Sequence, residues 1–201
     1  RRLFYRLLDI LLLRSWHVRK TLRSIGPSLP SQAKVLDAGM GFGQYSWWMA
    51  RRFPSWEITA ADIKSEQVAD CTNFFRRTGV ASRLQAVEAD LVTWNSGKQY
   101  DLILCVDVME HIEEDRTVFS NFRSMTATDG YLVISTPSDQ GGSDVHSDGD
   151  TSFIGEHVRD GYGIEDITEK LKTAGYREVS TYYTYGIPGS IAWRLSMKYP
   201  V

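Results

Sequence analysis

Short β-prone runs alternate with helical stretches through most of this chain, beginning at Ala33. Such alternation is typical of repeated β-α-β units, which build a parallel sheet with helices packed on it. The predicted strands are residues 34–39, 57–63, 84–90, 100–107, 130–136 and 178–185, and the predicted helices are residues 44–53, 65–78, 113–125 and 164–174. The sequence therefore predicts a doubly wound α/β fold, with a mostly parallel sheet and helices on both faces.

A glycine-rich turn follows the first predicted strand. Asp37 lies near the end of that strand, and Gly39, Gly41 and Gly43 occupy alternate positions before the next helix. Glycine suits such a turn because it adopts backbone angles that other residues avoid, and because a missing Cβ lets the backbone approach a ligand. A dinucleotide-binding turn would read G-x-G-x-x-G, whereas the third glycine here comes one residue early. The spacing argues against a nucleotide-dependent oxidoreductase, which stays open as an alternative.

Two more aspartates end the second and third predicted strands. Asp62, followed by Ile63, lies where a carboxylate can accept both hydroxyls of a ribose. Asp90, followed by Leu91, can accept a hydrogen bond from an exocyclic amine such as that of adenine. Together with the glycine turn, these two acids indicate a nucleoside site at the carboxyl edge of the sheet.

The fourth predicted strand leads through Val106 into Val108-Met109-Glu110-His111. In this order, the glycine turn, the two acids and this strand resemble the class I S-adenosylmethionine (SAM)-dependent methyltransferases. The Glu110-His111 pair is similar to the small-molecule subgroup, methyltransferase type 11, which includes the ubiquinone-pathway O-methylating enzymes. The resemblance covers roughly residues 33–186. It implies a Rossmann-like fold, SAM as cofactor and S-adenosylhomocysteine as product.

The resemblance also implies roles for individual residues. The glycines would line the methionine and sulfonium end of SAM, and Asp62 would hold its ribose. His111 is a candidate general base because the unperturbed pKa of histidine lies near neutrality, although it can equally cap a helix or orient a loop. The predicted cofactor-binding residues are Asp37, Gly39, Gly41, Gly43, Asp62, Ile63, Asp90, Leu91 and Val106.

A long segment rich in Gly, Ser and Asp, residues 137–162, follows the fifth predicted strand. Irregular segments of this length inside a compact domain are usually functional lids or disordered. Near its end, His157 is a second candidate base, and Glu156, Arg159 and Tyr162 are candidate substrate-binding residues, together with Glu110. Local salt bridges that close this segment onto the last helix explain the same residues equally well. The pattern departs from a calcium-binding loop, so no metal site is predicted.

The charge of the chain is distributed unevenly. Residues 1–25 carry seven Arg or Lys against the single acid Asp9, which leaves 16 basic and 24 acidic residues in the remainder. We expect residues 1–25 to form an amphipathic basic helix ahead of a SAM-binding domain at residues 26–201. This helix either packs on the domain, contacts a membrane surface or covers the substrate. The acidic remainder argues against nucleic-acid substrates, since their affinity comes largely from Lys and Arg.

Cys71 and Cys105 have neither the spacing of a metal site nor the density of a disulfide scaffold. We therefore expect a cytoplasmic protein, with a peripheral location at the inner face of a membrane as the alternative. Neither a membrane span nor a signal peptide is expected. The predicted activity is methyl transfer to an O or N atom of a small-molecule or lipid-like acceptor, and a SAM-binding module without turnover is the alternative. The sequence leaves the identity of the acceptor and the oligomeric state open.

Overall fold

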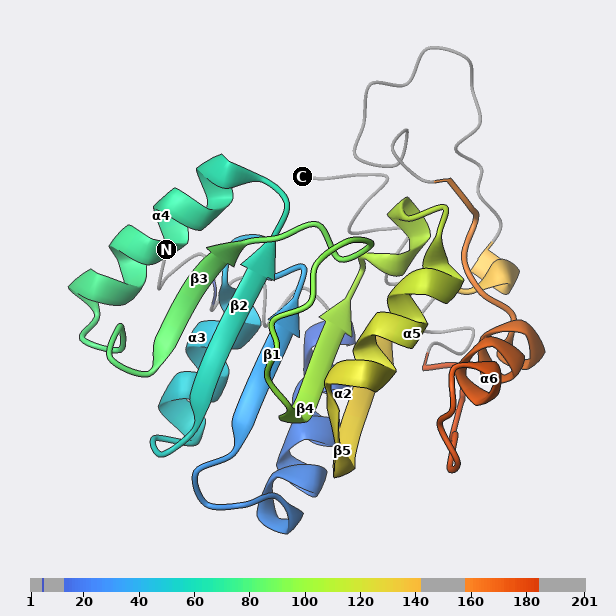
Figure 1. Cartoon of the computed structure of the whole chain (residues 1–201), viewed down its shortest axis with the longest axis horizontal. Helices are drawn as coiled ribbons and strands as arrows, with labels where there is room; N and C mark the ends of the chain where they lie inside the picture. The colour runs from blue at the N-terminus through green and yellow to red at the C-terminus, as the bar shows by residue number, and fades with distance from the viewer. Residues whose placement is uncertain (1–4, 6–12, 142–157, 185–201) are drawn as a thin grey trace. The chain divides into compact units, whose positions relative to one another are not determined.

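The computed structural model describes Tyr5, residues 13–141 and residues 158–184. Five parallel strands form one sheet in the order β3-β2-β1-β4-β5 (Figure 1). The strands are β1 Lys34–Ala38, β2 Glu57–Asp62, β3 Leu84–Glu88, β4 Tyr100–Val106 and β5 Thr126–Ser135. The chain changes direction across the sheet between β1 and β4, and α/β proteins bind ligands at the carboxyl ends of strands at such a point.

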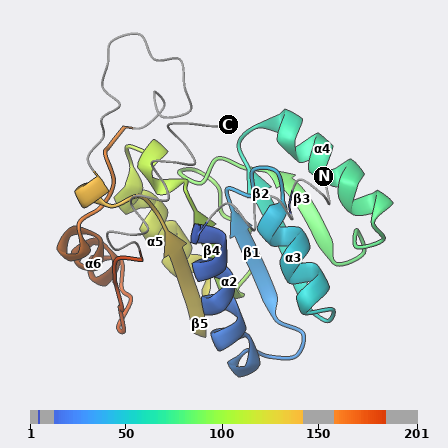
Figure 2. The same ribbon diagram turned by 180° about the vertical axis from the view of Figure 1, so that it is seen from behind.

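Helices lie on both faces of this sheet. These helices are α3 Gln44–Arg52, α4 Ser65–Arg77, α5 Asp115–Met125 and α6 Ile164–Thr173, and the 3-10 turns of this part of the chain are η2 Met109–His111 and η3 Asp139–Gly141. A further helix, α2 Leu13–Ile25, and the 3-10 turn η1 Gly26–Ser28 belong to a separate unit. Figures 1 and 2 view the sheet from opposite sides, and α3 and α5 lie on opposite faces. α4 packs against α3, with the rings of Trp47 and Phe74 5.8 Å apart. The predicted Rossmann-like, doubly wound architecture is confirmed.

The face under α5 carries the larger part of the core. α5 is amphipathic, and its apolar side chains recur at the three- and four-residue spacing of one helix face. They pack in one cluster with strand residues such as Leu36, Ile103 and Cys105. Full burial of each large apolar side chain contributes roughly 1.5–3 kcal/mol. The buried residues of α5 in this cluster are Val118, Phe119, Phe122 and Met125.

Two strand predictions need correction. β5 begins at Thr126, directly after α5, because Thr126 pairs with Tyr100 before an irregularity shifts the register between Tyr100 and Leu102. The strand predicted at residues 178–185 is absent from residues 178–184, the part of it that the structure describes. Aromatic and β-branched residues favour strands only where a paired, half-buried surface receives them. Tyr182 instead is 62% exposed.

Contacts divide the chain into two units. Residues 29–179 form one unit, which contains the whole sheet, and residues 1–28 group with residues 180–201 in the other. Within the predicted basic N-terminal helix, the described residues 13–25 are helical as α2. No described helix combines the length and the apolar character needed to cross a bilayer.

Candidate active site

The glycine-rich turn joins β1 to α3 at the carboxyl edge of the sheet. Gly39, Gly41 and Gly43 have φ angles of 77°, 51° and 76°, in the left-handed region that favours glycine. A Cβ at Gly39 would overlap the side chain of Val108, and one at Gly43 would lie 3.0 Å from Phe75 Cζ. Overlap with Val108 therefore requires glycine at position 39, whereas at position 43 the left-handed φ and the close contact with Phe75 together favour it.

Gly41 has a different environment. A Cβ there would meet only Gln67 Oε1, at 3.9 Å, so the protein leaves room beside this residue. The Gly41 N–H donates to Asp62 Oδ2 at 2.8 Å, and the Lys64 N–H donates to Asp62 Oδ1 at 2.9 Å. Each carboxylate oxygen can accept a further hydrogen bond. Asp62 thus joins the glycine turn to the end of β2, and its carboxylate oxygens can still accept hydrogen bonds from a ligand.

Asp37 holds the turn from beneath. Its side chain is 1% exposed, and the Ser46 hydroxyl of α3 donates to Asp37 Oδ2. Burial raises the pKa of Asp37 to about 6, against the opposing effect of the Ser46 hydrogen bonds. Because this carboxylate is enclosed between β1 and α3, it orients the first turn of the helix and does not face solvent.

The end of β3 lies beside the end of β2. Ala89 N–H donates to the Asp62 carbonyl at 2.9 Å, and the exposed Asp90 accepts the Val92 N–H at Oδ1, also at 2.9 Å. Leu91 is buried, whereas the side chain of Ile63 is 63% exposed. The structure therefore brings the predicted ribose-side and adenine-side residues to neighbouring strand ends.

The end of β4 is a strained turn that leads into η2. Val106 is the last residue of β4, and Asp107 has a φ of 50°, the one positive value among the non-glycine residues that the structure describes. Residues outside glycine adopt this conformation at a cost, and such strain clusters at functional sites. Glu110 is 1% exposed and accepts a 3.2 Å hydrogen bond from Thr136 Oγ1, whereas His111 is partly exposed. The predicted base therefore lies at the accessible side of the turn and Glu110 lies beneath it.

A buried charged cluster lies directly behind η2, centred on Asp115 at the start of α5. Asp115 Oδ2 accepts hydrogen bonds from Arg159, from Tyr162 at 2.8 Å and from Lys170 at 2.9 Å. Burial opposes ionisation, but the donors on Lys170 and Tyr162 and the charge of Arg159 together lower the pKa of Asp115. Burial and the adjacent carboxylate raise the pKa of Tyr162. The cluster therefore holds an ionised Asp115 among three hydrogen-bond donors.

This cluster changes the interpretation of two predicted substrate residues. Arg159 also donates to the carbonyls of Ile112 at 2.6 Å and Glu113 at 3.2 Å, and Tyr162 is 3% exposed. The Arg159 Nη atoms and the Tyr162 hydroxyl thus pair within the protein, whereas the buried Arg159 Nε has no hydrogen-bond partner among the described residues. These contacts support a structural role for both residues. The sequence had suggested local salt bridges as the other explanation, but nothing in it distinguished Asp115 as their partner. Glu156 and His157 lie outside the described residues.

The ends of the long segment meet beside η2. Tyr162 N–H donates to the Pro137 carbonyl at 3.0 Å, and Val158 N–H donates to the Glu110 carbonyl at 3.0 Å. A Cβ at Gly161 would lie 2.6 Å from the Pro137 carbonyl oxygen, so the close approach requires glycine there. The returning end of the segment is thus fixed to the turn that carries Glu110 and His111.

Comparison with known proteins agrees with this arrangement. Residues 35–130 match the family model described as a methyltransferase domain. The chain is 26% identical over 106 residues to the ubiquinone biosynthesis O-methyltransferase of Rickettsia canadensis, covering 53% of this chain and 43% of that one. It is 33% identical over 76 residues to the tRNA1(Val) (adenine(37)-N6)-methyltransferase of Glaesserella parasuis, covering 37% of this chain and 32% of the relative. The chain spans less than half the length of either relative.

Solved structures share the fold. The [4+2]-cyclase SpnF superposes with a TM-score of 0.60 at 19% identity, over 72% of this chain and 50% of the cyclase. Coclaurine N-methyltransferase superposes with a TM-score of 0.52 at 21% identity, over 57% of this chain and 34% of the enzyme. The parallel sheet and the glycine turn thus carry a methyltransferase-domain match at residues 35–130, on the fold of the class I SAM-dependent methyltransferases. The proteins that it resembles in sequence include ubiquinone biosynthesis O-methyltransferases.

Proposed function

We propose that this protein transfers a methyl group from SAM to an O or N atom of a small-molecule or lipid-like acceptor. The observation that carries the proposal is the Asp62 carboxylate, held by the Gly41 and Lys64 N–H groups beside the open space at Gly41. A carboxylate in this position suits the two hydroxyls of a ribose. The exposed Ile63 next to it offers apolar surface to an adenine ring.

The remaining cofactor contacts follow the strand ends. We assign the exocyclic amine of adenine to Asp90, with Leu91 at the border of that pocket, and the methionyl end to the glycine turn and Val106. Asp37 contributes by orienting the turn through Ser46. The proposed cofactor-binding residues remain Asp37, Gly39, Gly41, Gly43, Asp62, Ile63, Asp90, Leu91 and Val106.

SAM supplies an electrophilic methyl group on a cationic sulfur. The residues of the chain would hold the acceptor in line with that methyl group, and positioning of two reactants can be worth roughly 7–11 kcal/mol. A general base adds a factor of about 10² to 10⁴. We propose His111 as the base that removes the acceptor proton, positioned by the buried Glu110, and His157 as the alternative.

Two features support a small acceptor. The residues after β4 read Asp107-Val108-Met109-Glu110, without the Pro-Pro-aromatic run expected of enzymes that methylate amino groups in nucleic acids. The acidic charge outside residues 1–25 also disfavours polyanions. We further propose a cytoplasmic setting, supported by two buried free cysteines, and contact of residues 1–25 with a membrane surface, supported by their basic charge.

Calorimetric titration with S-adenosylhomocysteine tests the cofactor site. We expect micromolar or tighter binding by the intact chain, loss of at least about tenfold in affinity for Asp62→Ala, and no change for the exposed control Asp129→Ala. Gly41→Val should block the site by filling the space beside it. No binding by the intact chain would remove the proposal.

Turnover is tested separately with a panel of hydroxyl and amine acceptors, by release of S-adenosylhomocysteine. Binding without release from any acceptor would favour a SAM-binding module that lacks activity. Stabilisation by NAD in place of SAM in a thermal melt would favour the nucleotide-dependent oxidoreductase.

A further inference from the structure

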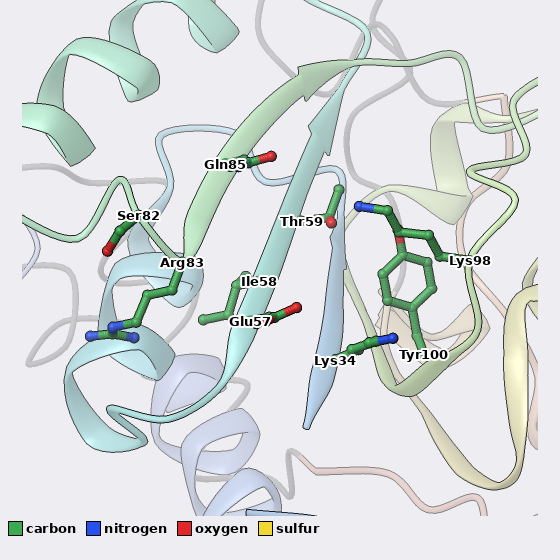
Figure 3. Close-up of a pocket in the computed structure, with 9 residues that line it drawn as sticks. All are labelled: Lys34, Glu57, Ile58, Thr59, Ser82, Arg83, Gln85, Lys98 and Tyr100. Carbon is green, nitrogen blue, oxygen red and sulfur yellow. The ribbon is translucent and has the colours of Figure 1, made fainter. Parts of the chain in front are cut away.

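A polar cavity of about 320 Å³ lies at the amino-terminal ends of the strands, the edge of the sheet opposite to the glycine turn (Figure 3). Its volume falls within the range of small-molecule sites, roughly 300–1,000 Å³. The side chains that matter for its chemistry are Lys34, Glu57, Thr59, Gln85, Lys98 and Tyr100. None of them belongs to the proposed methyl-transfer site.

The cavity exists because part of one sheet face lacks a helix. Thr59 pairs with Gln85, and two residues further along Ala61 pairs with Val87, so these four side chains share a face. Ala61 and Val87 pack in the core cluster, whereas Gln85 is exposed. The connection from β3 to β4, residues 89–99, contains no helix that could cover the polar pair.

Tyr100 gives the cavity an unsatisfied polar group. The residue is 1% exposed, and its hydroxyl has no hydrogen-bond partner among the described residues. Buried polar groups in proteins are nearly always hydrogen-bonded, so each exception calls for an explanation. The hydroxyl of a residue that lines a polar cavity is explained if the cavity receives a ligand that pairs with it.

The charges indicate which ligand. Lys34 and Lys98 line the same cavity, and neither ammonium group forms an ion pair within the described part of the chain. Figure 3 shows both lysine side chains extending beside the ring of Tyr100. A phosphomonoester carries a charge of about −1.5 to −2 at neutral pH, which two ammonium groups match.

Hydroxyl-binding groups lie along the neighbouring strands. The carboxylate of Glu57 accepts hydrogen bonds from hydroxyls, and the hydroxyl of Thr59 and the amide of Gln85 both donate and accept. We propose that the cavity binds a small phosphorylated polyhydroxy compound of the sugar-phosphate class. Its phosphate lies between Lys34 and Lys98 and accepts the Tyr100 hydroxyl. This site is independent of the proposed methyl transfer.

Calorimetric titration of the full chain with ribose 5-phosphate, inorganic phosphate and ribose tests this site. We expect saturable binding of ribose 5-phosphate, weaker binding of phosphate and weaker still of ribose. Lys98→Gln should weaken ribose 5-phosphate binding about tenfold, because one charge-assisted hydrogen bond is lost. The control Lys172→Gln, an exposed lysine on α6, should leave it unchanged.

Tyr100→Phe separates ligand binding from folding. Without ligand, the variant should melt about 2–4 °C higher because a buried unpaired hydroxyl is removed, yet it should bind ribose 5-phosphate less tightly. Unchanged affinity for S-adenosylhomocysteine verifies that each variant is folded. The proposal fails if ribose 5-phosphate does not bind at millimolar concentrations, binds no more tightly than phosphate, or binds Lys98→Gln as well as the parent protein.

Discussion

Asp37 and Asp115 are both buried aspartates, yet their environments shift their pKa values in opposite directions. Asp37 accepts a hydrogen bond from the neutral Ser46, and burial raises its pKa to about 6. Asp115 faces Arg159 and Lys170, and its pKa is lowered although the residue is only 4% exposed. Burial alone therefore does not decide whether a carboxylate in this protein is ionised, because the partners do.

The two aspartates also differ in how far along the chain their partners lie. Ser46 is nine residues from Asp37, within one strand-turn-helix unit. Arg159 and Lys170 lie 44 and 55 residues from Asp115. The side-chain contact of Asp37 thus stays within a short stretch of the chain. The Asp115 cluster instead joins segments that are distant in the sequence, behind Glu110 and His111.

The largest expected effect on stability is at the glycine turn between β1 and α3. Gly39→Ala combines a left-handed backbone with overlap against Val108, so we expect a loss of about 4 kcal/mol in the free energy of unfolding. Gly41→Ala is the matched control, since it adds strain without overlap and should cost about 1 kcal/mol. Urea denaturation measures both. Equal costs would mean that the contact between Gly39 and Val108 does not constrain the turn.

The second largest effect on stability is expected at the Asp115 cluster. Asp115→Asn keeps the shape of the side chain but leaves Arg159 and Lys170 facing a neutral group, and we expect a loss of about 3 kcal/mol in unfolding free energy. Urea denaturation at neutral pH measures this loss. A change within experimental error would show that the cluster is too hydrated to stabilise the fold.

The dependence of stability on pH should separate the two aspartates. Because the pKa of Asp37 is raised on folding, its favourable contribution is complete below about pH 4 and is lost as the pH rises through about 6. Relative to Asp37→Asn, the parent protein should therefore lose about 2 kcal/mol between pH 4 and pH 7. Parallel stability curves for the two proteins over this range would contradict the raised pKa.

Asp115 should behave in the opposite way. Its pKa is lowered on folding, so its contribution is present above about pH 4 and is lost as the pH falls through the lowered value. The difference between the parent protein and Asp115→Asn should accordingly shrink in acid. Unfolding curves below pH 4 measure it.

The smallest effect is expected at the exposed pair formed by Arg116 and Glu169, 2.8 Å apart with side chains 55% and 57% exposed. Glu169→Gln should leave the urea midpoint unchanged, because solvent screens such a pair. This variant is the control for Asp115→Asn, since both remove a carboxylate that contacts a basic partner. If Glu169→Gln lowered the free energy of unfolding as much as Asp115→Asn does, solvent exposure would not explain the difference between the two ion pairs.

Local signals predicted most of the fold. The helix and strand boundaries from β1 to β4 follow apolar periodicity and the glycine turn, features that operate within a few residues. The early start of β5 at Thr126 could not be predicted, since it depends on pairing with Tyr100 of β4. Residues 178–184 have the composition of a strand but lack a pairing partner in the part of the chain that the structure describes.

The sequence by itself determined the order of strands and helices along the chain, the glycine turn, and the acids at the strand ends that carry the resemblance to class I methyltransferases. Only the tertiary structure decided that Arg159 and Tyr162 bind Asp115, that Val108 closes over Gly39, and that Tyr100 lines a cavity. Backbone angles and periodicity are fixed by near neighbours. Contacts across many residues depend instead on which strands pair and which faces the helices cover.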